Sequence, residues 1–392
     1  MGKKRVIVVG GGASGLMAAI TAARNGATVT ILEQNEKTGK KICATGNGKC
    51  NFTNIRVPQD AYRSENPGFE QNVLEQFSVE DTVKFFTCLG IYPVNKNNGY
   101  LYPHSGQASS VAEVLNLEAL SLGVKIKTNE HVQDISRENN IWKVHTSSWA
   151  YEGEAVILAN GSRASAISGS DGSGYQLAAS LGHQIIEPLP ALTALKCKNT
   201  GFAGWAGVRT EGKVTLLAEG EKVTEETGEL QLTDYGVSGI PVFQISRYAI
   251  RALKQGKKVK LYLNFLPEFS EEQLMAFLEK RKENCPYKGK KTFLTGLFPD
   301  KLSKVLLQAQ DLAEAIRCYP LNVTGYLPFE QAQVCSGGVD TREVDAMTLE
   351  SRYKSDIFFA GELLDIDGKC GGYNLQWAWS SGYVAGLNAS II

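Results

Sequence analysis

The stretch from Arg5 to Glu33, RVIVVGGGASGLMAAITAARNGATVTILE, constrains the fold of this chain more than any other part. It begins with four consecutive β-branched residues, 6–9, which predict a strand buried on both faces, as in a parallel sheet. An alanine-rich helix from Ser14 to about Asn25 follows, and then a second strand that ends at Glu33. This order predicts a βαβ unit near the start of the chain.

The glycines between the first strand and the helix have the spacing G-x-G-x-x-G. Gly10 permits the tight turn, Gly12 lets the backbone approach a pyrophosphate, and Gly15 lets the helix pack closely on the strand. The helix N-terminus favours phosphates, and Glu33 is positioned to accept hydrogen bonds from an adenosine ribose. An ordinary βαβ turn is the alternative, but strand, helix and acid together favour an adenine dinucleotide. The motif leaves open whether this is FAD or NAD.

Length and composition restrict the class of protein. The length of 392 residues predicts two or more domains, because a single hydrophobic core rarely grows that large. A formal net charge of zero gives no overall attraction for nucleic acid or membranes, although it is compatible with a local basic patch. The eight cysteines lack paired metal-ligand spacing, so we expect free thiols and no metal site. Without a signal peptide or a long apolar run, the sequence predicts a cytoplasmic protein with no membrane span.

The loop after the second strand, residues 39–54, has the sequence GKKICATGNGKCNFTN. Its backbone N–H groups and lysines suit contacts with further phosphate or ring-carbonyl groups, and a long surface loop is the alternative. Cys43 and Cys50 raise the hypothesis of a redox disulfide. Their spacing does not match the C-x4-C of pyridine-nucleotide disulfide reductases, which argues against it.

The chain from 66 to 182 alternates helical and strand patterns. We expect helices over 66–90 and 110–123, then short strands, the last of which is apolar and ends in a small-residue turn at 155–161. The glycines at 169, 172 and 174 precede another helix, and their spacing favours a helix entry loop over a second dinucleotide site. His104 lies in a turn and is more simply solvated than catalytic.

From Pro188 the pattern changes to strands separated by glycine and charged turns, and then to helices. Ser270 is the predicted N-cap of one of these helices. Lysines gather at 254–260 and again at 288–291, as on a solvated face, with contact to RNA phosphates as the alternative. This part reads as an inserted β-rich and helical module.

Near the end of the chain an apolar strand, Ile357 to Ala360, leads into Gly361 and Glu362, and a glycine pair at 371 and 372 then opens a helix. This pattern predicts a second cofactor contact. A simple nicotinamide dehydrogenase needs no such contact, whereas the ribityl chain and ring system of a flavin extend beyond the pyrophosphate. The second contact therefore favours FAD.

These blocks together resemble the YhiN/BaiN-like family of FAD-dependent oxidoreductases. The resemblance covers essentially the whole chain, and its specific parts are TGNGKCNFTN, ILANG, SGGV, GELLDIDG and GGYNLQWAWSSG. It implies an α/β fold in which a Rossmann-like FAD-binding domain, 1–188 and 327–392, is interrupted by a β-barrel-like plus helical domain, 189–326.

The resemblance also implies which residues contact FAD. They are Gly10, Gly12, Ala13, Ser14 and Gly15 for the pyrophosphate, Glu33 for the ribose, Val132 for the adenine, Ala159, Asn160 and Gly161 for the nucleotide edge, Lys41, Asn47 and Gly48 for the flavin side, Gly361 and Glu362 for the ribityl or phosphate region, and Gly372, Tyr373, Asn374 and Leu375 for the isoalloxazine.

The known activities of the family are reductions of an activated carbon–carbon double bond, in bile acids in one branch and in a uridine of ribosomal RNA in another. They imply that NAD(P)H reduces the flavin, that flavin N5 delivers hydride to the β-carbon, and that an acid protonates the neighbouring carbon. The zero net charge favours a small enone of the bile-acid or steroid type. Ribosomal RNA as substrate, and a non-catalytic flavin-binding redox or regulatory protein, are the alternatives.

Cys50 is the first candidate for the proton donor, and Lys49 is a candidate for polarising the substrate carbonyl. The alternative, that Cys50 merely packs against the flavin, has equal weight. Lys49 stands where the family usually has arginine, so a bidentate contact becomes a point charge. Cys335 and Ser336 replace the commoner threonine and alanine. The sequence leaves the oligomeric state open.

Overall fold

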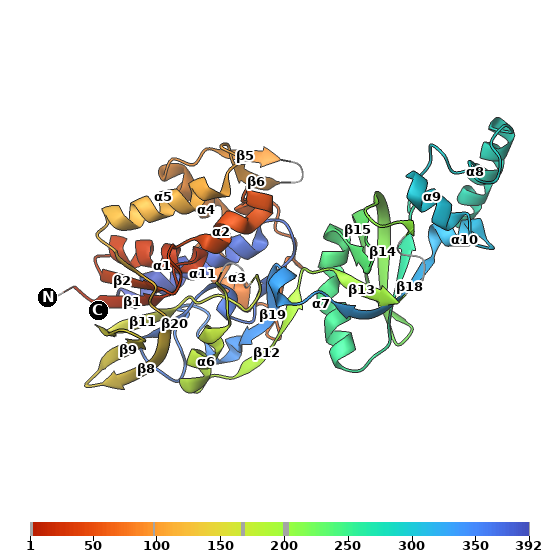
Figure 1. Cartoon of the computed structure of the whole chain (residues 1–392). Helices are drawn as coiled ribbons and strands as arrows, with labels where there is room; N and C mark the ends of the chain where they lie inside the picture. The colour runs from red at the N-terminus through yellow and green to blue at the C-terminus, as the bar shows by residue number, and fades with distance from the viewer. Residues whose placement is uncertain (1–2, 97–98, 166–168, 199–203, 392) are drawn as a thin grey trace. The chain divides into compact units, whose positions relative to one another are not determined.

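A computed structural model describes residues 3–96, 99–165, 169–198 and 204–391 (Figure 1). The chain divides into two compact units. The first unit combines Met1–Pro188 with Val334–Ile392, and the second unit, Leu189–Gln333, is inserted between these segments. The first unit is therefore built from both ends of the chain, and each unit has its own hydrophobic core.

The first unit is organised around a five-stranded parallel sheet. Its strands, in spatial order, are β20 (Ile357–Phe359), β11 (Ala155–Leu158), β1 (Arg5–Val9), β2 (Thr28–Glu33) and β7 (Lys125–Thr128). Val8 in the central strand pairs with Ile31 on one side and Ile157 on the other, and its side chain is fully buried. The predicted strand, and with it the Rossmann-like α/β class, is confirmed.

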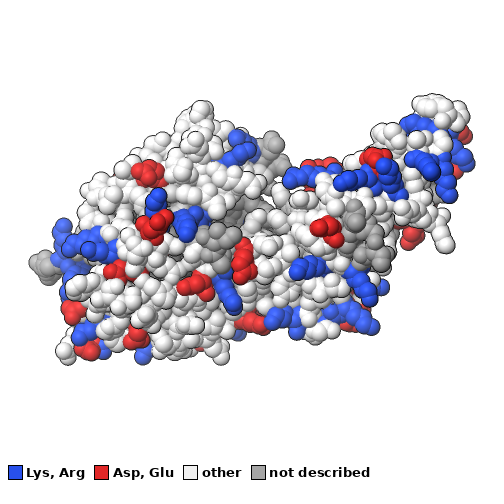
Figure 2. All heavy atoms as spheres, viewed as in Figure 1, with Lys and Arg blue, Asp and Glu red and all other residues white. Residues whose placement is uncertain are grey.

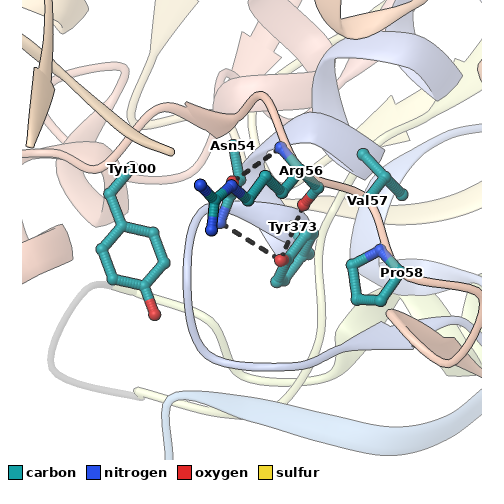
Figure 3. Close-up of a pocket in the computed structure, with 6 residues that line it drawn as sticks. All are labelled: Asn54, Arg56, Val57, Pro58, Tyr100 and Tyr373. Carbon is teal, nitrogen blue, oxygen red and sulfur yellow. Dashed lines mark hydrogen bonds between the residues drawn. The ribbon is translucent and has the colours of Figure 1, made fainter. Parts of the chain in front are cut away.

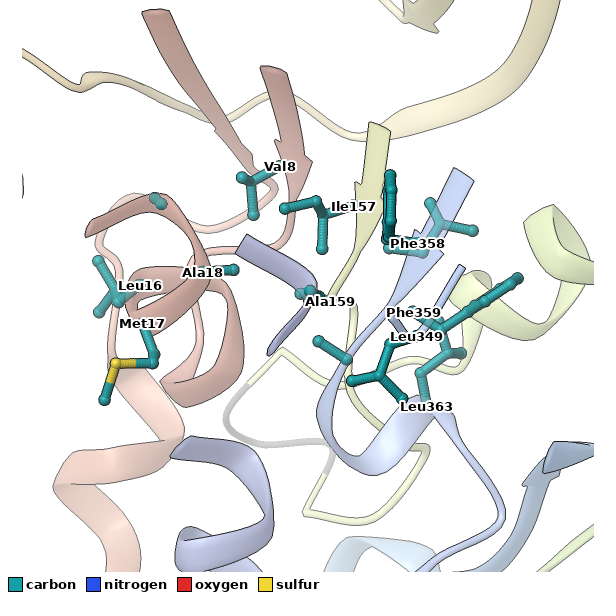
Figure 4. Close-up of a cluster of buried hydrophobic side chains, with 14 of the residues drawn as sticks. Val8, Leu16, Met17, Ala18, Ile157, Ala159, Leu349, Phe358, Phe359 and Leu363 are labelled. Carbon is teal, nitrogen blue, oxygen red and sulfur yellow. The ribbon is translucent and has the colours of Figure 1, made fainter. Parts of the chain in front are cut away.

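Two helices from opposite ends of the chain pack closely on each other, α1 (Ala13–Arg24) and α11 (Tyr373–Ala389). Two glycines of α11 permit this approach. A Cβ on Gly382 would lie 2.4 Å from the backbone oxygen of Ser14, and one on Gly386 would lie 2.3 Å from that of Ala18. Figure 4 shows residues of α1 in the same buried cluster as side chains from β11 and β20. The last helix of the chain thus supports the first.

The expected helix over 66–90 is instead two helices, α3 (Phe69–Gln76) and α4 (Val79–Cys88). Ser78 is the cause of the break. Its side chain accepts a hydrogen bond from the Asp81 backbone N–H, and the Asp81 carboxylate accepts one from the Ser78 N–H, which forms a capping box. An apolar periodicity that runs through both helices therefore conceals a helix start.

The first unit has further elements beside the sheet and these helices. They are α2 (Lys40–Ala44), η1 (Thr45–Gly48), β3 (Thr53–Asn54), β4 (Tyr62–Arg63), β5 (Pro93–Lys96), β6 (Tyr100–Pro103), α5 (Ala108–Ser121), β8 (Val132–Glu138), β9 (Ile141–Thr146), β10 (Ala150–Gly153), α6 (Ser173–Ser180), β19 (Val334–Val339), η5 (Thr341–Glu343), η6 (Gly361–Leu363) and β21 (Asp367–Gly368), and β12 (Ile185–Ala191) continues into the second unit.

The second unit contains a closed barrel, which confirms the expected β-barrel-like insertion. The barrel strands, in spatial order, are β13 (Leu195–Lys198), β16 (Gly236–Ser238), β15 (Glu221–Leu232), β14 (Arg209–Ala218), β17 (Val259–Asn264) and β18 (Tyr319–Tyr326). Along β17, Val259, Leu261 and Leu263 are buried while Lys260 is exposed, which is the alternation of a strand with one face on a core.

The helices of the second unit are α7 (Ile240–Lys254), α8 (Glu271–Asn284), α9 (Asp300–Leu306) and α10 (Leu312–Arg317), with a short turn η4 (Phe329–Gln331). Ser270 is the N-cap of α8, as predicted, and its partner in the capping box is Gln273. The second unit extends to Gln333, and the chain after β18 runs back along the segment at 192–194. Leu327 N–H donates to the Ala194 oxygen there.

Figure 2 shows basic side chains gathered over the helical end of the second unit, with acidic side chains among them. Among the helices of the second unit, Arg317 pairs with Glu271 and Lys304 pairs with Asp300. In the part of the chain that the structure describes, no helix is both long and apolar enough to cross a membrane.

Candidate active site

The three glycines of the G-x-G-x-x-G motif differ in how much space surrounds them. A Cβ on Gly10, where φ is +102°, would lie 2.5 Å from the Ala159 oxygen, and one on Gly15 would lie 1.9 Å from the Gly10 oxygen. Gly12, the N-cap of α1, has φ of −78°, and a Cβ there would meet nothing within 4 Å. Gly10 and Gly15 are therefore required for packing, whereas Gly12 faces open space at the helix N-terminus.

The carboxylate of Glu33 is buried at the end of β2, beside the glycine turn. It accepts hydrogen bonds of 2.8 Å from the Gly11 N–H and 2.8 Å from the Asn35 N–H. Glu130 N–H donates to the backbone oxygen of Glu33, which brings the start of β8, with Val132, beside this edge. An acid, a glycine turn and an apolar side chain thus meet where the adenosine half of a dinucleotide is expected.

The far end of the chain reaches the same turn. A Cβ on Gly361, at φ of +73°, would lie 2.4 Å from Ser14 Oγ, so η6 is in close contact with the first turn of α1. Ala159 and Gly161 come directly after β11, the strand that pairs with β1. Between them, the buried Oδ1 of Asn160 has no hydrogen-bond partner among the described residues. The residues expected at the nucleotide edge therefore converge.

A polar cluster lies beside this turn. Lys41 Nζ is 2.6 Å from Glu362 Oε2, and Ser162 Oγ donates to the same oxygen at 2.8 Å. Cys335 lies against Ser162, and the hydroxyl of Tyr175 lies against Cys335. Burial raises the pKa of the Cys335 thiol and of the Tyr175 hydroxyl, so both stay protonated at neutral pH.

The loop TGNGKC has an unusual backbone. Gly46, Asn47, Gly48 and Cys50 all have positive φ, between 54° and 81°. Asn47, Gly48 and Lys49 are exposed, whereas the Cys50 side chain has no exposed surface and burial raises its pKa to about 12. The geometry presents Lys49 to solvent and withdraws Cys50 from it.

Cys43 and Cys50 are both free thiols, Cys43 exposed and Cys50 buried. No group of metal-ligating side chains occurs among the described residues. Gly169 and Gly172 lie in the loop that enters α6, and Gly172 is the N-cap of this helix. Residues 166–168 lie outside the described part. His104 is exposed beside Tyr92.

The N-terminus of α11 is built on a strained glycine pair. A Cβ on Gly372, where φ is +93°, would lie 2.7 Å from the Thr53 backbone carbon, so the helix start is pressed against β3. Asn374 uses both ends of its side-chain amide on the backbone of Gly368. Tyr373 is buried and Leu375 is half-buried. The Asn374 side chain therefore supports the turn, and the first backbone N–H groups of α11 have no acceptor within the helix itself.

An open pocket of about 520 Å³ adjoins this helix start (Figure 3). It is lined by Asn54, Arg56, Val57, Pro58, Tyr100 and Tyr373. Sequence reasoning identified only Tyr373 of these. Asn54 is the last residue of the TGNGKCNFTN block, and this block was the sequence signal that could have pointed to the pocket. Arg56 and Tyr100 belong to no motif.

A family model described as the HI0933-like protein Rossmann domain matches residues 4–388, almost the whole chain. The chain belongs to the HI0933-like family. It is 45% identical over 405 aligned positions to a 3-dehydro-bile acid delta(4,6)-reductase of Clostridium scindens, which covers 98% of this chain and 99% of the relative. It is 30% identical to a ribosomal RNA dihydrouridine synthase of Haemophilus influenzae, with 98% of both chains covered.

A solved structure supports the fold of this HI0933-like chain. The 3-ketosteroid-delta4-(5alpha)-dehydrogenase of Rhodococcus jostii RHA1, in complex with 4-androstene-3,17-dione, aligns with a TM-score of 0.52 and 15% identity over 99% of this chain and 97% of that one. The expected family is confirmed. The chain is an oxidoreductase of this family, and its fold is shared with that 3-ketosteroid dehydrogenase.

Proposed function

We propose that this chain is an FAD-dependent reductase of a carbon–carbon double bond conjugated to a carbonyl, that its substrate is a small enone of the bile-acid or steroid type, and that NAD(P)H is its electron donor. The observation that carries the proposal is the 45% identity, over nearly the full length of both chains, to a bile acid reductase. The relative that acts on ribosomal RNA is more distant, at 30% identity.

The residues of the first unit fit FAD. Open space at Gly12 leaves room for a pyrophosphate against the N-terminus of α1, and Glu33 is held where it can reach a ribose. The unpartnered Oδ1 of Asn160 offers an acceptor at the nucleotide edge. The proposed contacts are those expected from the sequence, Gly10, Gly12, Ala13, Ser14, Gly15, Glu33, Lys41, Asn47, Gly48, Val132, Ala159, Asn160, Gly161, Gly361, Glu362, Gly372, Tyr373 and Leu375, with Asn374 as a support of the turn.

Bound flavin would supply the hydride for such a reduction. The N-terminus of α11, starting at Gly372, would place its positive dipole end beside the flavin and stabilise negative charge on the reduced ring. Lys49, exposed on the loop before Cys50, would polarise the carbonyl of the substrate.

Cys50 remains a hypothetical proton donor, and its burial favours the packing alternative. A Cys50→Ala variant is expected to keep turnover within about twofold and to lose about 1–2 kcal/mol of unfolding free energy, the usual cost of removing a small buried group. Steady-state kinetics and urea unfolding measure the two effects. Cys88→Ala, at an exposed cysteine, is the control. A loss of turnover of more than about 100-fold, with reduction by NAD(P)H unchanged, would instead make Cys50 the acid.

The proposal is tested with purified protein. A flavin absorbance spectrum is expected, followed by bleaching with NADH or NADPH and rapid reoxidation, without oxygen, when a bile-acid or steroid enone is added. Absence of FAD would refute the account of the first unit. Bound FAD that neither an enone nor ribosomal RNA reoxidises would leave a redox or regulatory protein.

Ribosomal RNA is the second candidate, favoured by the relative at 30% identity and by exposed lysines of the second unit at 254–260. For this function, anaerobic reoxidation should require RNA rather than the enone. Retention on RNA should also weaken steeply as salt rises, because binding to phosphates releases counterions.

A further inference from the structure

The open pocket beside the start of α11 is rigidly built. Asn54 is 2% exposed, and its Nδ2 donates to the Gly371 oxygen and the Tyr373 hydroxyl, each at 3.1 Å. Its Oδ1 accepts from the Arg56 N–H at 2.9 Å. A buried amide thus fixes the backbone from which the Arg56 side chain extends (Figure 3).

Two tyrosine rings, of Tyr373 and Tyr100, form apolar walls of the pocket. The Tyr373 hydroxyl donates to the Arg56 backbone oxygen at 2.9 Å, and the Tyr373 ring packs edge-on against Tyr62. The Tyr100 ring packs against Gly371, where φ is +126°. A Cβ on this residue would lie 2.8 Å from the ring, so glycine is needed to make room for it. With Val57 and Pro58, these rings form a surface for a flat apolar molecule.

Among the described residues that line the pocket, Arg56 is the charged one. Arg56 is exposed and makes no ion pair with any residue in the described part of the chain, and none of the other lining residues is acidic. Burial raises the pKa of Tyr100 and of Tyr373, so their hydroxyls remain neutral and do not repel an anion. A planar guanidinium beside apolar walls suits a carboxylate attached to an apolar body.

We propose that this pocket is a substrate subsite in which Arg56 binds the carboxylate of an amphipathic acid whose apolar body lies against Tyr100 and Tyr373. The inference rests on the proposed function, and it deepens that function by naming the substrate as an acid rather than a neutral steroid. Bile acids carry such a carboxylate on a rigid apolar body, which agrees with the relative at 45% identity.

The test measures binding without turnover. The FAD-loaded protein is titrated with a saturated bile-acid carboxylate, which cannot be reduced, and with its neutral methyl ester, and the Kd is followed by flavin absorbance and by equilibrium dialysis. Arg56→Gln is expected to weaken the acid about fivefold and to leave the ester unchanged, because the contact is exposed to solvent. Arg56→Lys should retain part of the preference for the acid.

Two further variants sharpen the test. Val57→Asp adds a carboxylate to the wall, and it is expected to weaken the acid but not the ester. Arg209→Gln removes an arginine that pairs with Glu229 on the barrel, and it should change neither Kd. Equal weakening of acid and ester by Arg56→Gln, no weakening of either, or an effect on retention of ribosomal RNA alone would overturn the assignment. Because the ligand is not reduced, loss of enone turnover alone would refute the proposed function and not this site.

Discussion

Gly12→Val is expected to leave the protein folded and to lower its affinity for FAD by about 100-fold or more. In the structure a Cβ at this position meets nothing within 4 Å, and the backbone is extended, with φ of −78° and ψ of −164°, so valine fits without strain. The space that its side chain would fill is the space in front of the N-terminus of α1. Two charge-assisted hydrogen bonds to phosphate, each worth about 1.5–3 kcal/mol, account for the expected loss.

Titration of the stripped protein with FAD, followed by quenching of flavin fluorescence, measures the affinity. Circular dichroism and urea unfolding of the same stripped protein report on the fold. Gly289→Val is the matched control, because a Cβ there also meets nothing within 4 Å but the residue lies in the second unit. Unchanged FAD affinity in Gly12→Val would show that the pyrophosphate does not bind at this turn.

The βαβ unit that is proposed to bind the adenosine half of a dinucleotide was predictable because its signals are local. The residues from Arg5 to Glu33 are a strand, a turn, a helix and a strand in one continuous segment, and each step depends on neighbours in sequence. The acid at the end of β2 also has a position set by the motif itself. The same reasoning found Gly361 and the glycine pair before α11, because each follows or precedes a regular element.

The pocket beside α11 was not predictable, because only the tertiary fold brings its parts together. Asn54 and Tyr373 are 319 positions apart in the chain, and Arg56 and Tyr100 belong to no motif. The pairing of Lys41 with Glu362 spans 321 positions, and although the sequence named both residues, it did not show that they pair. The break between α3 and α4 was missed for a different reason, since the apolar pattern continues through both helices and the boundary is marked by the capping residue Ser78.

Gly386→Ala is expected to lower the free energy of unfolding of the first unit by about 2 kcal/mol, although alanine is the better helix former. Helix propensity alone would favour alanine by about 1 kcal/mol. The added Cβ would lie 2.3 Å from the Ala18 oxygen, 2.9 Å from its Cα and 3.0 Å from its carbonyl carbon. Overpacking typically costs about 1–3 kcal/mol, and it costs more where backbone must move, as it must here. Overpacking therefore outweighs the gain in propensity.

Urea unfolding followed by tryptophan fluorescence measures this loss, because Trp377 and Trp379 lie on α11 and are buried. Gly289→Ala, where a Cβ has free space, should leave the unfolding curve unchanged. An added Ala18→Gly substitution should not rescue Gly386→Ala, since the crowded atoms of residue 18 are backbone atoms that glycine retains. Rescue by this second substitution, or a more stable Gly386→Ala variant, would mean that α1 and α11 can separate at little cost. The supporting contact between the two ends of the chain would then be looser than the glycines of α11 indicate.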